Sequence, residues 1–123
     1  MEKIYATGFH NPFLPLDIYI PDGEPKVFDG RVYLYGSKDL FGGEYCCHKY
    51  HVYSADARDL QHWTDHGPAL ASTDEYADEG IMDGVPWSDG LLWAPDVVER
   101  DDWYYLYFCL SDGSEGVARS RKP

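Results

Sequence analysis

The dipeptide Asp29-Gly30 is the feature that most constrains the fold of this chain. It lies between two short runs, residues 24–28 and 31–37, that contain the β-branched and aromatic residues typical of strands. A two-residue loop of type I′ needs positive φ angles, which glycine adopts without steric cost. The pattern therefore predicts a hairpin of two antiparallel strands.

A candidate site residue, Asp22, lies directly before the first of these strands, between Pro21 and Gly23. These neighbours favour an irregular backbone, so the side chain is not committed to strand pairing. Catalytic and binding residues are often held in this way, in a loop supported by a rigid element. An Asp before a Gly is also a common turn residue, so the position alone assigns no role.

The chain divides into four parts. Residues 1–21 hold three prolines among apolar residues, which excludes a helix and predicts an extended N-terminal arm. Residues 22–70 form a first sheet, residues 71–90 a long acidic loop, and residues 91–123 an incomplete second sheet. Strands after the first hairpin are expected at 47–54, 63–70, 91–99, 103–110 and 117–120. Pro68 places the second of these at a sheet margin, because proline has no amide proton to donate.

The second half of the chain repeats the pattern of the first. Pro25-Lys-Val-Phe and Tyr33-Leu-Tyr correspond to Pro95-Asp-Val-Val and Tyr105-Leu-Tyr, with two extra residues in the second turn. A repeated unit of strand, turn, strand, loop and strand is typical of the blades of a β-propeller. The predicted fold class is therefore all-β and antiparallel, with one propeller blade and most of a second.

Composition narrows the possible partners. A formal net charge of −12 over 123 residues repels nucleic-acid phosphates and anionic membrane surfaces, which leaves neutral or cationic ligands. Aromatic residues make up 16% of the chain, enough for core packing and also for a surface that stacks on sugar rings. There is no run of about 18 apolar residues and no apolar N-terminal segment, so we expect neither a membrane span nor a signal peptide, and a cytoplasmic location.

Cysteine, histidine and acidic residues show no metal-site spacing. Cys46 and Cys47 are neighbours that would point to opposite faces of a strand, and with Cys109 they are interpreted as reduced packing residues. His48 and His51 are a poor metal pair for the same reason. The carboxylates of the acidic loop could hold calcium, but their spacing matches no EF-hand, and a solvated face is the favoured interpretation.

Five segments together resemble glycoside hydrolase family 43. They are Asn11-Pro-Phe-Leu-Pro15, Ile20-Pro-Asp-Gly-Glu-Pro25, Val32-Tyr-Leu-Tyr-Gly-Ser37, Val52-Tyr-Ser54 followed by Trp63-Thr-Asp-His-Gly67, and Trp93-Ala-Pro-Asp-Val97. The resemblance implies part of a five-bladed β-propeller, from enzymes that cleave arabinose- and xylose-containing glycans. From the residues of this chain we expect no cofactor and no metal site.

The resemblance also implies roles for single residues. Asp22 would be the general base, with Glu24 as a weaker rival, because Pro-Asp-Gly-Glu-Pro replaces the commoner Asp-Pro pattern. Asp96 would orient the general acid and tune its pKa. It is also an anomaly in its own right, because an ionised side chain inside an apolar strand is costly. Trp93 either lines the sugar pocket or packs between blades.

The chemistry explains why such a site needs several carboxylates. An inverting hydrolase keeps one carboxylate charged to activate water and another protonated to serve the leaving oxygen, about 6.5 to 9.5 Å apart. A third negative charge near the acid raises the pKa of that acid. In the family the acid is a Glu on a later blade, and Glu115, expected in a turn, is no substitute for it.

The predicted function is therefore the N-terminal part of an inverting arabinosyl or xylosyl hydrolase, inactive in isolation. The alternative is a non-catalytic carbohydrate-binding or self-assembling propeller module. In either case the expected partners are a carbohydrate and, because two blades leave open faces, a second copy or a chain carrying the missing blades.

Overall fold

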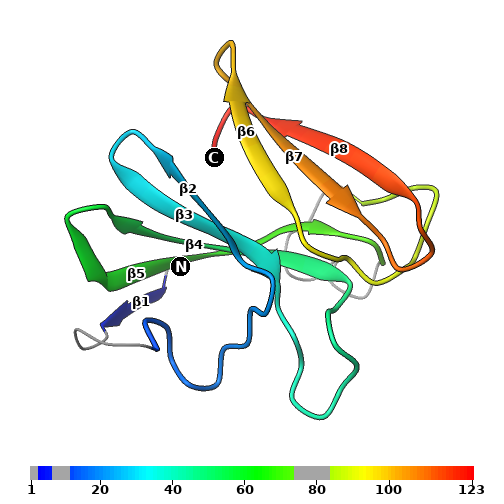
Figure 1. Ribbon diagram of the computed structural model, residues 1–123, viewed down its shortest axis with the longest axis horizontal. Coiled ribbons are helices and arrows are strands. Elements are labelled where there is room, and N and C mark those ends of the chain that lie inside the picture. Colours follow the sequence, from blue (N-terminus) through cyan, green and yellow to red (C-terminus); the bar gives the residue numbers. More distant parts are fainter. Residues whose placement is uncertain (1–2, 7–11, 74–83) are drawn as a thin grey trace.

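The computed structural model describes residues 3–6, 12–73 and 84–123, and within these ranges every regular element is a strand (Figure 1). Most of the predicted acidic loop, with its possible calcium ligands, lies outside the described residues. The strands are β1 (Lys3–Ala6), β2 (Glu24–Phe28), β3 (Arg31–Ser37), β4 (Lys49–Asp56), β5 (Asp59–Ala71), β6 (Asp96–Arg100), β7 (Trp103–Cys109) and β8 (Glu115–Ser120). They form two antiparallel sheets, ordered β1-β5-β4-β3-β2 and β6-β7-β8.

Each sheet begins with a tight hairpin. Asp29 and Gly30 have φ angles of 48° and 73°, as the predicted type I′ turn requires. Asp101 and Asp102 close the β6–β7 hairpin with φ angles of 52° and 60°. Aspartate tolerates this left-handed region better than most residues, so a second two-residue turn forms without glycine.

The two extra residues of the second repeat therefore do not lie in its turn. The alignment of the two halves of the sequence placed them there, and that prediction is wrong. Phe28 pairs with Arg31 and Arg100 pairs with Trp103, so both hairpins enclose two residues. Counting back from these pairs, Glu24 and Asp96 occupy equivalent positions, each the first residue of its strand.

β5 and β6 differ most in extent from the prediction. β5 runs for 13 residues, and Pro68 lies in it beyond the stretch, residues 62–65, that pairs with β1. β6 begins only at Asp96. The preceding residues join the sheets instead: Leu92 forms bridges to both Cys47 and Leu110.

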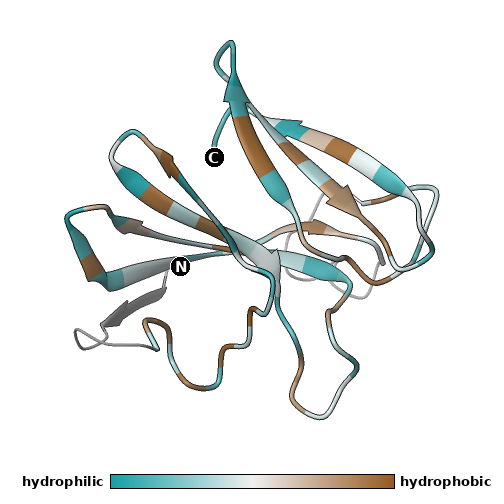
Figure 2. Ribbon diagram, in the orientation of Figure 1, coloured by the Kyte–Doolittle hydropathy of each residue, from teal (hydrophilic) through white to brown (hydrophobic). Residues whose placement is uncertain are grey.

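The core has layers on both faces of the first sheet. On one face the segment 12–20 packs over the sheet, with a buried cluster of Leu14, Leu34, Tyr53, Ala55 and Trp63. The other face meets the second sheet through Phe28, Tyr35, Val52 and Val97. A third cluster, which includes Tyr50, Leu92 and Leu110, joins the sheets beyond β6. Figure 2 shows the hydrophobic residues of β6 as one continuous stretch between hydrophilic ends.

Candidate active site

Edge strands of the two sheets, β2 and β6, lie against each other. β2 and β6 are in contact, and they are the neighbouring edges of sheets that diverge from this line (Figure 1). Asp22 is an exposed turn residue just before β2, and Asp96 is the first residue of β6. The Asp96 side chain is 52% exposed, so the expectation that it sits inside an apolar strand is wrong. Asp96 is the first residue of β6, so its carboxylate lies at the start of the strand.

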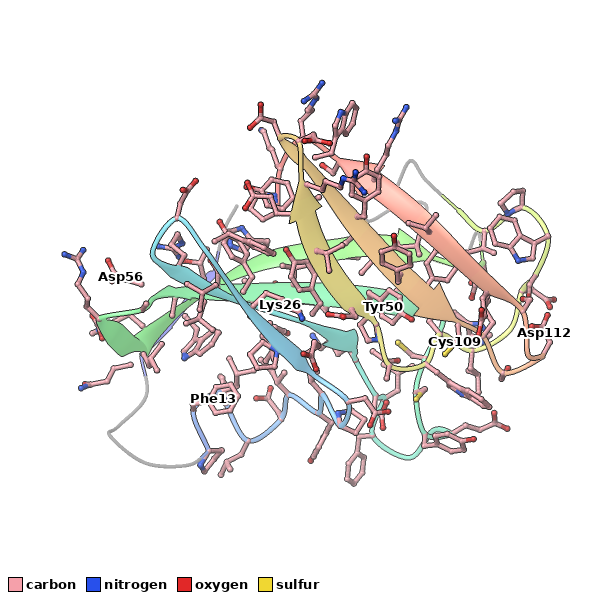
Figure 3. All side chains as sticks on the ribbon, turned by 45° about the horizontal axis from the view of Figure 1, so that its top comes forward. Phe13, Lys26, Tyr50, Asp56, Cys109 and Asp112 are labelled. Atoms are coloured by element: carbon pink, nitrogen blue, oxygen red, sulfur yellow. The ribbon has the colours of Figure 1, made fainter. Side chains whose placement is uncertain are left out.

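Lys26 connects the two strands, and the sequence analysis missed it. Its Nζ atom lies 2.7 Å from Oδ1 of Asp96 and 3.5 Å from Oε1 of Glu24. The hydrogen bond to Asp96 raises the pKa of Lys26 above its usual value. Figure 3 places Lys26 where β2 passes β6. The available signal was the two-residue period of a strand, which puts Glu24 and Lys26 on one face.

Two contacts hold the Asp96 carboxylate in place, the ion pair with Lys26 and a backbone hydrogen bond. Its Oδ1 atom accepts a hydrogen bond from the backbone N–H of Val97, at 2.8 Å, in addition to the contact with Lys26. Lys26 therefore holds two of the predicted site residues, Glu24 and Asp96, at one place. Asp22 is two residues from Glu24 along the chain.

A further carboxyl group, Asp39, lies near Asp22. Burial raises the pKa of Asp39, and the negative charge of Asp22 raises it further, while the backbone N–H of Cys46 donates to it and opposes the rise. Burial also raises the pKa of the Cys46 thiol to about 11, with added contributions from the charges of Asp39 and Asp22. Asp22 thus lies within electrostatic reach of the loop that follows β3.

Trp93 is half-buried between the sheets. Its backbone N–H donates to the carbonyl of Cys109 at 3.0 Å, and its own carbonyl accepts a hydrogen bond from the Tyr50 hydroxyl. Its indole N–H is buried without a hydrogen-bond partner among the described residues. Tyr50 and Cys109 are neighbours in this region (Figure 3). These contacts give Trp93 a packing role between the sheets, and any role toward a sugar remains a prediction.

A cavity of about 280 Å³ lies beside Asp96. Pro95, Tyr107 and Glu115 contribute to its walls. Glu115 is the first residue of β8, not a turn residue as expected from the sequence. The cavity lies along the second sheet, and two carboxyl groups, those of Asp96 and Glu115, contribute to its lining.

Histidines and cysteines of the described residues are engaged in local contacts. Nε2 of His51 lies 2.5 Å from Oδ1 of Asp65, whereas Nδ1 of His48 lies 3.1 Å from the hydroxyl of Ser72. All three cysteines are free thiols, and Cys46 and Cys47 are buried. No group of three potential metal ligands occurs within residues 3–6, 12–73 and 84–123.

Comparison with known proteins gives this arrangement a family. The profile of glycosyl hydrolases family 43 matches residues 9–123. The chain belongs to glycosyl hydrolase family 43. A xylosidase/arabinosidase of Thermoclostridium stercorarium is 44% identical over 103 residues, which is 81% of this chain and 20% of that protein. Xylosidase/arabinosidase 43A of Humicola insolens is 37% identical over 120 residues, 87% of this chain and 34% of that protein.

Solved structures show the same relationship in three dimensions. A family 43 enzyme of Xanthomonas citri, complexed with xylotriose, superposes with a TM-score of 0.73 at 32% identity, covering 95% of this chain and 33% of that one. The two antiparallel sheets are thus blades of the family 43 propeller, as the sequence predicted. The chain spans about a third or less of the length of these relatives. Its described part contains no helix with the length and hydropathy of a membrane span.

Proposed function

We propose that this family 43 chain contributes the general base and the acid-tuning carboxylate of a hydrolase that cleaves arabinosyl or xylosyl linkages with inversion. Asp22 activates the water as general base, and Asp96 orients the general acid and raises its pKa. The observation that carries the proposal is the double contact of Lys26. Because one ammonium group touches both Glu24 and Asp96, the starts of β2 and β6 lie together, and Asp22 is beside them.

The positions of Asp22 and Asp96 agree with two separate catalytic roles, one at the start of each strand. Each carboxylate is placed at or before the start of the innermost strand of a blade, where the pairing of the sheet supports the backbone but leaves the side chain exposed. An inverting mechanism also needs a protonated acid on the opposite side of the glycosidic bond. The family resemblance assigns that role to a Glu on another blade, so no residue of this chain takes it.

The substrate class follows the names of the relatives, which are xylosidases and arabinosidases. The alternative of a non-catalytic binding module has no comparable support. We propose a neutral pentose glycan as the substrate, which also agrees with a net charge of −12.

Release of aryl alcohol from aryl xylosides and arabinosides tests the catalytic proposal. We expect no turnover by the 123-residue chain alone and turnover when a segment carrying the remaining blades is supplied. Asp22→Asn and Asp96→Ala should each abolish that turnover, while the matched control Asp102→Asn, in the β6–β7 turn, should not. Turnover by the isolated chain would refute the need for a missing acid, and Glu115, beside Asp96, would be the first residue to test in that role.

We also propose that another chain or copy covers the outer face of the second sheet. Val98, Tyr107 and Val117 are 41%, 50% and 53% exposed. Tyr107 pairs with Val117, and Val98 pairs with Tyr105 two residues from Tyr107, so all three share the face that points away from Val97 and the first sheet. Light scattering at micromolar concentration should show self-association. A stable monomer would contradict the proposal, unless a chain carrying further blades binds to it.

The free thiols support one further proposal, a reducing compartment such as the cytoplasm. Cys46 and Cys47 are buried as thiols, and disulfides are rare where glutathione keeps thiols reduced. Thiol counting on protein isolated from its native cell tests this, because an oxidised cysteine would argue for an extracellular location.

A further inference from the structure

A cavity of about 240 Å³ lies between the two sheets. Its walls come from β3, β4 and β5 of the first sheet and from β6, β7 and β8 of the second. The sheets touch at β2 and β6 and diverge from there, which leaves a wedge between them (Figure 1). Protein interiors contain few voids larger than a water molecule, so a cavity of this size is a candidate binding site.

The lining of the cavity is mostly apolar. Side chains from both sheets contribute, namely Val52, Ala69, Leu70, Val97, Leu106 and Ala118. Water is held in a cavity only where it finds two to four polar partners, and these side chains offer none. A dry apolar cavity of about 150 Å³ is large enough for a benzene ring. This cavity therefore has room for one ring with a short substituent.

Two tyrosines complete the walls. Tyr35 is 4% exposed, and its hydroxyl is buried without a hydrogen-bond partner within the described residues. Burial raises the pKa of Tyr35 well above its usual value, so the group is an uncharged hydroxyl. Tyr104 packs edge-on against Phe28, with 5.0 Å between the ring centroids. The packing of the sheets thus leaves a polar group unsatisfied at an aromatic wall, as expected of a site that a ligand completes.

The charged residues at the cavity are cations. Arg119 and Lys122 contribute to the lining, whereas no Asp or Glu does so in the described part of the chain. The guanidinium of Arg119 stacks on the ring of Trp103, 4.4 Å from its centroid. Lys122 is exposed, and its ammonium group forms no ion pair within residues 3–6, 12–73 and 84–123. A cation beside an apolar cavity favours an apolar ligand that carries one negative charge.

We propose that this cavity binds a small aromatic carboxylate, with its ring between the sheets and its carboxylate at the ammonium group of Lys122. The ring fills the apolar wedge, and the carboxylate supplies the anion that pairs with Lys122. The site uses none of the candidate catalytic carboxylates, so it does not depend on the proposed hydrolase function. Because the ligand contacts both sheets, it binds only when they are packed together and stabilises the folded chain.

Calorimetric titration of the 123-residue chain with cinnamate tests the proposal. Cinnamyl alcohol has the same ring without the charge, and acetate has the charge without the ring. We expect cinnamate to bind about two- to fivefold more tightly than cinnamyl alcohol, which corresponds to about 0.4–1 kcal/mol. This is the range of an exposed ion pair. Acetate should show no measurable binding, because it leaves the apolar cavity unfilled.

Three variants locate the ligand. Lys122→Gln should remove the difference between cinnamate and cinnamyl alcohol, whereas Arg58→Gln, which removes an 89% exposed cation between β4 and β5, should preserve it. Ala118→Leu should weaken the binding of cinnamate by at least about tenfold, because the added atoms occupy the cavity. Ala69→Leu makes the same test from the first sheet, at an exposed position. Circular dichroism verifies that each variant is folded.

Each result decides one part of the proposal. Equal affinities for cinnamate and cinnamyl alcohol, or a difference that survives Lys122→Gln, would refute the ion pair and with it the ligand class. Unchanged affinity in a folded Ala118→Leu or Ala69→Leu variant would place the ligand outside the cavity and refute the site. A folded chain that does not bind cinnamate would overturn the whole inference, and the assay with aryl glycosides would be unaffected.

Discussion

Substitution of Gly36 by alanine should show how tightly the arm packs against β3 near Asp22. Gly36 is buried in β3, and an added Cβ atom would lie 2.2 Å from Cγ2 of Ile20. The added Cβ atom would also lie 3.3 Å from the Cα atom of Gly23, so the backbone there limits the room for it. Ile20 must therefore move. Because Ile20 is two residues before Asp22, its movement displaces the candidate base as well.

The expected magnitude follows from two opposed effects. Overpacking of this kind costs about 1–3 kcal/mol, while replacing glycine in a strand by alanine returns about 0.5–1 kcal/mol through the unfolded state. The net change lies between about 0 and 2.5 kcal/mol, with a central value of about 1 kcal/mol of destabilisation, which lowers the Tm of a domain of this size by about 4 °C. Gly84→Ala is the control, since within the described residues its added Cβ atom would meet only the carbonyl oxygen of Ala71, at an ordinary 3.6 Å.

Thermal unfolding followed by circular dichroism measures the effect, and a double-mutant cycle identifies its cause. Ile20→Ala removes the Cγ2 atom that the new methyl group would strike. In the Ile20→Ala background, Gly36→Ala should therefore cost nothing further, which corresponds to a coupling energy of about 1–2 kcal/mol. If the two substitutions are additive, the contact with Ile20 is not the source of the destabilisation, and the reasoning fails.

Three other predictions concern charge and exposure. Burial lowers the pKa of His51 below its usual 6.5, and the positive charges of Lys38 and Lys49 lower it further. The neighbouring Asp65 raises this pKa, but by less than burial lowers it. The imidazole is therefore neutral in the folded state. Its contribution to the stability of the fold is complete above pH 6.5 and is lost as the pH falls below that value. The Tm should drop between pH 7.5 and about 5.5, and His51→Gln should flatten this part of the profile. Lys26→Met should lower the Tm by removing the cation that joins β2 to Asp96, and Lys26→Arg should restore most of it, a result that an unimportant surface pair would not produce. The raised pKa of Cys46, about 11, predicts that iodoacetamide labels this thiol at least about tenfold more slowly in the folded than in the unfolded chain at pH 8, as peptide mass spectrometry would show; equal rates would contradict its burial.

Local chemistry was sufficient to predict the hairpins and the fold class. The φ angles at Asp29 and Gly30 depend on residues that are adjacent in sequence, and the two-residue period of a strand is visible without any partner. Asp22 and Asp96 could be proposed because each lies in a motif a few residues long. Even so, the length of the second turn was misjudged, because Asp101 and Asp102 form a type I′ turn without the glycine that signals one.

Contacts between the sheets were decided by the tertiary structure alone. Lys26 meets Asp96 across 70 positions of sequence because β2 and β6 are neighbouring edges of two packed sheets, and no local pattern encodes which edges become neighbours. The exposure of Asp96 also depended on the tertiary structure. The apolar run around it suggested burial, but Asp96 is the first residue of β6 and its side chain is 52% exposed. The arm lies beside the loop after β3, where the backbone N–H of Asp39 donates to the carbonyl of Tyr19, because the burial of Leu14 and its neighbours holds the arm against the first sheet. Turn chemistry is local and can be predicted from a few residues, whereas the site depends on how completed sheets pack, which is a property of the whole chain.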